Sequence, residues 1–151
     1  MPAWAERPRD DSSRETPHGV SALSSALDNL VRKFYSDWAV VSPRQLAAYF
    51  TPEATLQTPL QDRVITGANA IAGNIEIFRA RFENVDVEVV SIAASGNIVL
   101  CEHLWHYSMG RGNKFELAAQ DAFTFAEQRI SSWRRYFDPL KLTERVDLGE
   151  S

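Results

Sequence analysis

Residues 98–126, IVLCEHLWHYSMGRGNKFELAAQDAFTFA, decide the fold of this chain. Apolar and polar residues alternate on both sides of a central Gly-Arg-Gly-Asn turn signal, and a period of two is typical of paired strands. Two more alternating stretches, residues 85–93 and 130–138, flank this segment. The turn signals between the stretches are Ser95-Gly96-Asn97, Gly110-Arg111-Gly112-Asn113 and Glu127-Gln128-Arg129. We therefore expect four strands joined as successive antiparallel hairpins.

The chain before this segment has a helical period instead. Residues 21–41 carry apolar side chains at three- and four-residue spacing, which predicts a long amphipathic helix with Ser21 as its N-cap. The pair Ser42-Pro43 then predicts a second, short helix that begins at Pro43. Its apolar face would consist of Leu46, Ala47 and Phe50.

A break and a third helix follow. Thr51-Pro52 is expected to end the second helix, and residues 54–58 form a short strand. After Gly67 the helical period returns and predicts a third helix. Its apolar positions are Ile71, Ile75, Phe78 and Phe82.

Helices that come first and an antiparallel meander that follows predict an α+β fold. We expect three N-terminal helices packed on a strongly curved, mainly antiparallel sheet, which together enclose a cone with an internal pocket for a ligand. Residues 20–142 would form this single domain. The polar segments 1–19 and 143–151 are expected to be tails, with Trp4 as the one tail residue that could dock on the body.

Composition argues against several classes of protein. Of 151 residues, 44% are hydrophobic and 24% charged, which is ordinary for a globular domain and unlike a fibrous or disordered chain. A net charge of −4 without a Lys/Arg run argues against a nucleic-acid or membrane surface. The single Cys101 cannot form an internal disulfide, and the sequence has neither a metal-ligand spacing nor a nucleotide-binding motif. Without a signal peptide or a membrane-length apolar run, the expected location is the cytoplasm.

Strand alternation places Asp121 on an apolar face. The other members of that face are Phe115, Leu117, Ala119, Phe123 and Phe125. A carboxyl group among phenylalanines is costly to ionise without a partner, and Arg135 of the next strand could reach it. Asp121 could therefore act as acid, base or hydrogen-bond donor in a pocket, or form a structural ion pair with Arg135. A register error of one residue would instead place Asp121 in water.

The strand at 98–109 adds His103, Trp105 and Tyr107 on one face. His103 titrates near neutrality and could be a second acid or base beside Asp121, although a strand histidine can also be purely structural. Trp105 and Tyr107 could pack against the long helix or line a ligand site. On that helix Tyr35 lies within the apolar stripe and is a weaker candidate.

Two strings, FTPEATLQTPLQDRVITGANAI at residues 50–71 and ISSWRRYFDPLKL at residues 130–142, resemble the nuclear-transport-factor-two-like superfamily. Within it, the chain is similar to the branch of SnoaL-like polyketide cyclases and limonene epoxide hydrolases, over residues 21–142. The resemblance implies the cone-shaped α+β fold. Function follows less directly, because this superfamily hosts isomerases, dehydratases, cyclases, hydrolases and non-catalytic binding modules.

Departures from these relatives narrow what the resemblance implies. Where the epoxide hydrolases have an Arg-x-Asp pair and a second Asp, this chain has His103-Leu104-Trp105 and Arg135. Their water-holding Tyr and Asn correspond to Leu56 and Thr58, and the acid/base aspartate of the SnoaL-like cyclases also falls on Arg135. The usual apparatus for epoxide hydrolysis is therefore not expected.

The similarity to ketosteroid isomerases is partial. Asp121 matches the protonated aspartic acid that donates a hydrogen bond to the dienolate, whereas the base position is Thr58 and the oxyanion tyrosine position is Phe34. A retained donor without the usual base suits polarising a carbonyl group or shaping a reactive conformer of a lipophilic substrate.

The sequence thus predicts an enzyme that binds a lipophilic polyketide- or terpenoid-like molecule and promotes its cyclisation or isomerisation, without cofactor or metal. Asp121, His103 and Arg135 would be catalytic. The substrate-binding residues would be Trp105, Tyr107, Phe34, Trp38, Leu56, Phe123 and Phe137.

Two alternatives stay open: an epoxide hydrolase or epoxide-opening cyclase with a rearranged site, and a non-catalytic ligand-binding or dimerisation module. A homodimer is expected, because Leu100, Leu104 and Tyr136 would be exposed on the sheet of a monomer.

Overall fold

The computed structural model of the chain describes residues 18–110 and 112–142. The expected tails, with Trp4, lie outside these residues except for His18 and Gly19, which begin the first helix. The elements are α1 (His18–Trp38), α2 (Pro43–Leu46), the 3-10 turn η3 (Ala47–Tyr49), β1 (Phe50–Gln57), β2 (Ile65–Thr66), α3 (Ala68–Arg81), β3 (Glu83–Ser95), β4 (Ile98–Met109), β5 (Asn113–Ala126) and β6 (Arg129–Tyr136).

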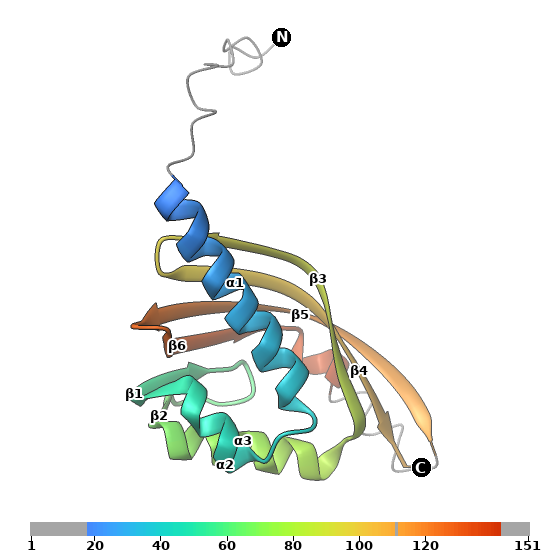
Figure 1. The fold of residues 1–151 in the computed structure, drawn as a ribbon. Coiled ribbons are helices and arrows are strands. Elements are labelled where there is room, and N and C mark those ends of the chain that lie inside the picture. Colours follow the sequence, from blue (N-terminus) through green and yellow to red (C-terminus); the bar gives the residue numbers. More distant parts are fainter. Residues whose placement is uncertain (1–17, 111, 143–151) are drawn as a thin grey trace, which may run out of the picture.

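The strands form one sheet in the order β2-β1-β6-β5-β4-β3. Neighbours pair antiparallel except β1 and β6, which pair in parallel. The predicted meander is confirmed as β3 to β6, and with it the α+β class. α1 crosses one face of the sheet, and α3 packs beside β1 (Figure 1). Because β1 and β2 precede α3 in the chain, the helices are not all N-terminal to the sheet.

One side of α1 is buried from Leu27 to Trp38, whereas Leu23, in the predicted apolar stripe, is 46% exposed. The helix begins at His18, before the predicted cap Ser21, and ends at Trp38. At this end the amides of Val40 and Val41 both donate to the carbonyl of Asp37. The buried side chains recur at the predicted spacing: Leu27, Val31, Phe34, Tyr35 and Trp38. Among the helices of the described residues, none has the length and apolar character needed to cross a membrane.

The predicted start of α2 is confirmed in detail. The Ser42 hydroxyl accepts from the Gln45 amide at 3.2 Å, and the Gln45 side chain accepts from the Ser42 amide at 3.3 Å. With Pro43 at the first helical position, this reciprocal pair is a capping box. Two consecutive serine and proline signals were thus enough to locate the helix start.

The expected helix break at Thr51-Pro52 is wrong. Phe50, predicted on the face of α2, begins β1, and Pro52 lies inside that strand. The pairing of β1 with β6 is irregular between Phe50 and Thr55, and such an irregularity can hold a proline, which has no amide hydrogen for the sheet. The third helix also ends at Arg81, so Phe82 follows it.

Alternation holds through the centre of the sheet. The odd-numbered residues of β4 from Val99 to Tyr107 are buried, and so are Leu117 to Phe125 at the odd positions of β5. In β6, Ser131 is an extra residue between the pairs Phe125–Ile130 and Thr124–Ser132. This bulge allows Ile130 and Trp133 to be buried on the same side.

Candidate functional site

Asp121 is the centre of a buried polar cluster. Its side chain is enclosed, and Arg135 lies directly opposite it on β6, as alternation predicted. The Tyr35 hydroxyl donates to Oδ2 at 2.6 Å, and Arg135 Nε donates to Oδ1 at 3.2 Å. Because each carboxylate oxygen accepts a hydrogen bond, the arrangement favours an ionised Asp121 with a compensating cation.

Sequence reasoning undervalued Tyr35. Its position in the apolar stripe of α1 is confirmed, but the hydroxyl reaches across to β5. Burial, and then the charge of Asp121, raise the pKa of Tyr35 well above its usual value, so the phenol keeps its proton and donates. The available signal was chemical: a tyrosine in a buried stripe needs a partner for its hydroxyl.

His103 lies beside the same carboxylate and is fully buried. Its Nε2 is 3.5 Å from Asp121 Oδ2, and its Nδ1 is 3.4 Å from the carbonyl oxygen of Cys101. Burial lowers the pKa of His103 from 6.5 to about 4, against the opposing effect of the Asp121 charge. At neutral pH the ring is therefore uncharged, and the contact with Asp121 is not an ion pair.

Neither neutral tautomer of His103 suits both neighbours. A proton on Nδ1 can be donated to the Cys101 carbonyl, but the Nε2 lone pair then faces the Asp121 carboxylate. With the proton on Nε2, the Nδ1 lone pair faces the carbonyl oxygen instead. Nε2 itself forms no hydrogen bond with any group in the described ranges 18–110 and 112–142, so this side of the buried ring is left unpaired.

Arg135 completes the cluster from β6. Its guanidinium carbon lies 4.3 Å from the ring centre of Trp105 and 4.9 Å from that of Trp133. Such cation–π contacts stabilise a cation that has left water. The structure thus brings all three predicted catalytic residues together around one carboxylate, with Tyr35 as a fourth member.

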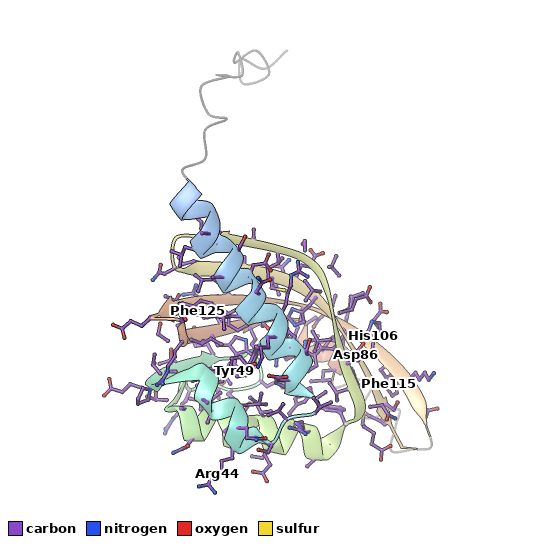
Figure 2. All side chains as sticks on the ribbon, viewed as in Figure 1. Arg44, Tyr49, Asp86, His106, Phe115 and Phe125 are labelled. Atoms are coloured by element: carbon purple, nitrogen blue, oxygen red, sulfur yellow. The ribbon has the colours of Figure 1, made fainter. Side chains whose placement is uncertain are left out.

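Aromatic side chains surround this cluster. Trp38 packs edge-on against Trp105 with ring centres 4.6 Å apart. Phe34 packs edge-on against Phe123 with ring centres 6.0 Å apart. Leu56 of β1 belongs to the same core. Side chains occupy the space between α1 and the sheet (Figure 2).

Two predicted lining residues lie apart from these. Tyr107 packs against Phe82 and Phe115 near the β4–β5 turn, beside a hollow of about 500 Å³ that includes Lys114. Phe137 follows the end of β6 and is half-buried. Tyr107 and Phe137 thus lie at the margins of the predicted site.

Several buried donors in the core have no acceptor. Within residues 18–110 and 112–142, no hydrogen-bond partner is found for Nε1 of Trp38, Trp105 and Trp133, for the Tyr107 hydroxyl or, as noted, for Nε2 of His103. Native interiors leave only a few polar groups per hundred residues unsatisfied. An oxygen atom of a ligand, or an ordered water molecule, beside any one of these donors would be stabilised by a hydrogen bond.

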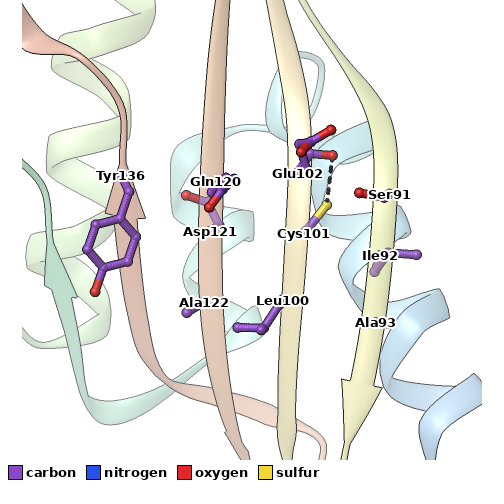
Figure 3. Close-up of a pocket in the computed structure, with 10 residues that line it drawn as sticks. All are labelled: Ser91, Ile92, Ala93, Leu100, Cys101, Glu102, Gln120, Asp121, Ala122 and Tyr136. Atoms are coloured by element: carbon purple, nitrogen blue, oxygen red, sulfur yellow. Dashed lines mark hydrogen bonds between the residues drawn. The ribbon is translucent and has the colours of Figure 1, made fainter. Parts of the chain in front are cut away.

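The opposite face of the sheet carries an apolar groove of about 300 Å³. Leu100, Ala122 and Tyr136, from three neighbouring strands, lie along it (Figure 3). Leu100 and Tyr136 are 54% and 57% exposed, as the sequence predicted for a monomer, whereas Leu104 is half-buried.

No group of three or more His, Cys, Asp or Glu side chains that could hold a metal ion is present in the described part of the chain.

Solved structures with the same fold are numerous. A candidate SnoaL-like polyketide cyclase from Jannaschia sp. CCS1 superposes with a TM-score of 0.75 at 13% identity, covering 87% of this chain and 95% of its own. For an LEH-like epoxide hydrolase from M. tuberculosis the TM-score is 0.69 at 19% identity, with 84% and 93% covered. A protein of ketosteroid-isomerase-like fold from Catenulispora acidiphila, in complex with trimethylamine, gives 0.66 at 21% identity, with 72% and 85% covered. At these identities the likeness establishes the fold alone.

The sequence comparisons add a match to a family model. No curated protein matches the chain. A family model described as SnoaL-like domain matches residues 31–133, which include α1 from Val31 onwards and every strand up to Trp133 of β6.

Proposed function

Because the chain belongs to the family of SnoaL-like domains, we propose that it binds a lipophilic small molecule between α1 and the sheet and promotes its cyclisation or isomerisation without a cofactor. One observation carries this proposal. Asp121 is held as an oriented carboxylate, with one donor on each oxygen, inside an aromatic core. Such a group can move a proton on a substrate that has been taken out of water.

In this proposal Asp121 shuttles the proton between two positions of the substrate. Arg135 stabilises the negative charge that develops on a substrate oxygen when the proton leaves carbon. Both ring nitrogens of His103 face protein groups and not the substrate. His103 is therefore a secondary acid or base in this proposal: its protonation state changes the charge beside Asp121, and Asp121 acts on the substrate. Tyr35 keeps the carboxylate oriented.

The pocket belongs to the proposal as well. We infer a cone-shaped cavity whose wall would be Trp105, Tyr107, Phe34, Trp38, Leu56, Phe123 and Phe137. A wall of this composition fits a polyketide- or terpenoid-like substrate, apolar over most of its surface with a few oxygen atoms for the unpaired indole donors. Assembly as a homodimer through the groove of Leu100 and Tyr136, and a cytoplasmic location, remain predictions.

The test begins with binding. A thermal-shift panel of lipophilic ketones, polyenes and epoxides identifies a ligand class, since a ligand at 100 times its Kd adds about 2.7 kcal/mol of stability. Turnover of the hits is then compared between the natural protein and Asp121→Asn. We expect the variant to lose about 100-fold or more in kcat, while Asp62→Asn on an exposed loop loses nothing.

The outcome also decides between the alternatives. Equal turnover by Asp121→Asn would leave Asp121 and Arg135 as a structural ion pair. Hydration of an epoxide substrate, with labelled solvent oxygen incorporated into the diol product, would favour the epoxide-opening enzyme. A protein that melts cooperatively and responds to no compound of the panel would favour the non-catalytic module.

A further inference from the structure

Arg135 has an unused edge on its guanidinium group. Nε donates to Asp121, but Nη1 and Nη2 form no hydrogen bond with any residue in the described ranges 18–110 and 112–142. The side chain is only 9% exposed. Four of the five N–H donors of this group therefore lie in a mostly buried site without a protein acceptor.

The neighbours of Arg135 restrict which acceptor can reach these donors. The rings of Trp105 and Trp133 lie against the guanidinium group, and Asp121 occupies its Nε side. The Nη1–Nη2 edge is the part of the group that forms no recorded hydrogen bond, so we take it as the edge that a partner would approach. Two parallel hydrogen bonds to one planar group fit this edge, and the rings already fix its orientation.

Resting on the proposed function, we propose that the Nη1–Nη2 edge of Arg135 receives the carboxylate of a lipophilic acid, and that His103 takes up the proton that balances the added charge. The first half follows from the fork geometry, which matches a carboxylate with two oxygen atoms in one plane. The ligand class is thus an aromatic or polycyclic carboxylic acid.

Charge balance assigns His103 its part. The charges of Asp121 and Arg135 cancel, so a bound carboxylate leaves one net negative charge in a buried site. The groups facing His103 are Tyr35 of α1, Cys101 of β4, Asp121 of β5 and Arg135 of β6. A protonated ring would place a positive charge 3.5 Å from the Asp121 carboxylate and would so offset the charge of the ligand.

In the free protein His103 is uncharged and can therefore take up a proton. Burial holds the pKa of His103 at about 4, so the ring is neutral near pH 7 before a ligand binds. A nearby anion raises the pKa of an imidazole, so proton uptake accompanies binding.

Calorimetric titration with 2-naphthoate and its neutral counterpart 2-naphthamide tests the first half. We expect the unmodified protein to bind naphthoate about tenfold or more tightly than naphthamide. Arg135→Lys, which keeps the charge beside Asp121, should lose this preference, while Arg134→Lys on the other side of β6 keeps it. Equal affinity for the two compounds in the unmodified protein, or an unchanged preference in Arg135→Lys, would overturn the assignment.

The pH dependence of naphthoate binding tests the second half. Its carboxylate stays ionised between about pH 6 and pH 8, so a rise in affinity towards pH 6 reports a proton taken up by the protein. We expect a severalfold rise in the natural protein and in His106→Gln, whose imidazole lies outside the sheet 2.9 Å from Glu88 (Figure 2). His103→Gln should be flat. An equal rise in His103→Gln, or no rise in the natural protein, would contradict the role of His103.

Failure of this inference is distinguishable from failure of the proposed function. If neutral ketones or polyenes bind and turn over while naphthoate has no advantage over naphthamide, the carboxylate inference fails alone. If neither naphthoate nor the neutral panel binds, both fail.

Discussion

At the scale of single residues, the polar core depends on hydrogen bonds to one buried carboxylate. Asp121 is 2% exposed and accepts from Tyr35 and Arg135. Burying an ion of this kind is costly unless its oxygen atoms accept hydrogen bonds. Removal of either donor should therefore lower the free energy of unfolding. Mutations at these positions should therefore affect stability as well as any activity.

Tyr35→Phe tests this point with minimal change of shape. Loss of the hydroxyl removes the 2.6 Å hydrogen bond that Tyr35 donates to Asp121 Oδ2. A hydrogen bond to a charged group contributes about 2 kcal/mol to stability. We expect urea denaturation to show a loss of that order. Tyr49→Phe, whose hydroxyl bonds to the half-buried Asp37, should cost less than about 1 kcal/mol. Equal losses in the two variants would contradict the special position of Tyr35.

His103 should make the fold sensitive to mild acid. The folded protein binds the His103 proton more weakly, with a pKa of about 4, than the unfolded chain does at the usual 6.5. Its contribution is therefore complete above about pH 6.5 and is lost as the pH falls towards 4, about 3 kcal/mol in all. Denaturation curves across this range should be flatter for His103→Gln than for His106→Gln. Parallel pH profiles for the two variants would count against a neutral, buried His103.

At the scale of elements, Gly67 joins β2 to α3. Its φ of 106° lies in the left-handed region, its amide donates to the carbonyl of Ala54 at 2.8 Å, and its carbonyl accepts from Ile71. A Cβ at this position would meet only the carbonyl oxygen of Pro52, at 3.8 Å, so space is available. The glycine is therefore needed for its backbone conformation.

Two glycine substitutions should have opposite effects. Gly67→Ala should destabilise the protein by about 1–3 kcal/mol through backbone strain. Gly73→Ala, inside α3 with open space around the added Cβ, should be neutral or stabilise by up to about 1 kcal/mol. Thermal melting of the two variants checks both. A tolerated Gly67→Ala would show that the β2–α3 junction can adopt another conformation.

At the scale of the whole molecule, the groove on the outer face of the sheet would be covered in the proposed homodimer. Leu100→Asp should then reduce the mass in solution from twice 17.0 kDa to 17.0 kDa, measured by light scattering. Val40→Asp is the control, because Val40 is 77% exposed and follows α1. A natural protein that is monomeric at high concentration would remove the dimer from the proposal.

Local patterns in the sequence determined much of this molecule. The period of two in residues 98–126 established the hairpin of β4 and β5, and with it the buried position of Asp121. The short turn after β5 brought Arg135 opposite Asp121. Ser42-Pro43 located the start of α2. Each of these depends on residues close in the chain, so alternation, helical spacing and turn chemistry were sufficient.

Only the tertiary structure decided the rest. Tyr35 and Asp121 are 86 residues apart, and no local pattern states which strand residue a helix residue will face. The parallel pairing of β1 with β6, which draws Phe50 and Pro52 into a strand, likewise depends on a distant partner. Strand pairing and core packing are determined by contacts between segments far apart in the chain, and these can override local propensity. The sequence alone thus determined the hairpins and the polar residues they bury, and packing decided which of those residues share a hydrogen bond.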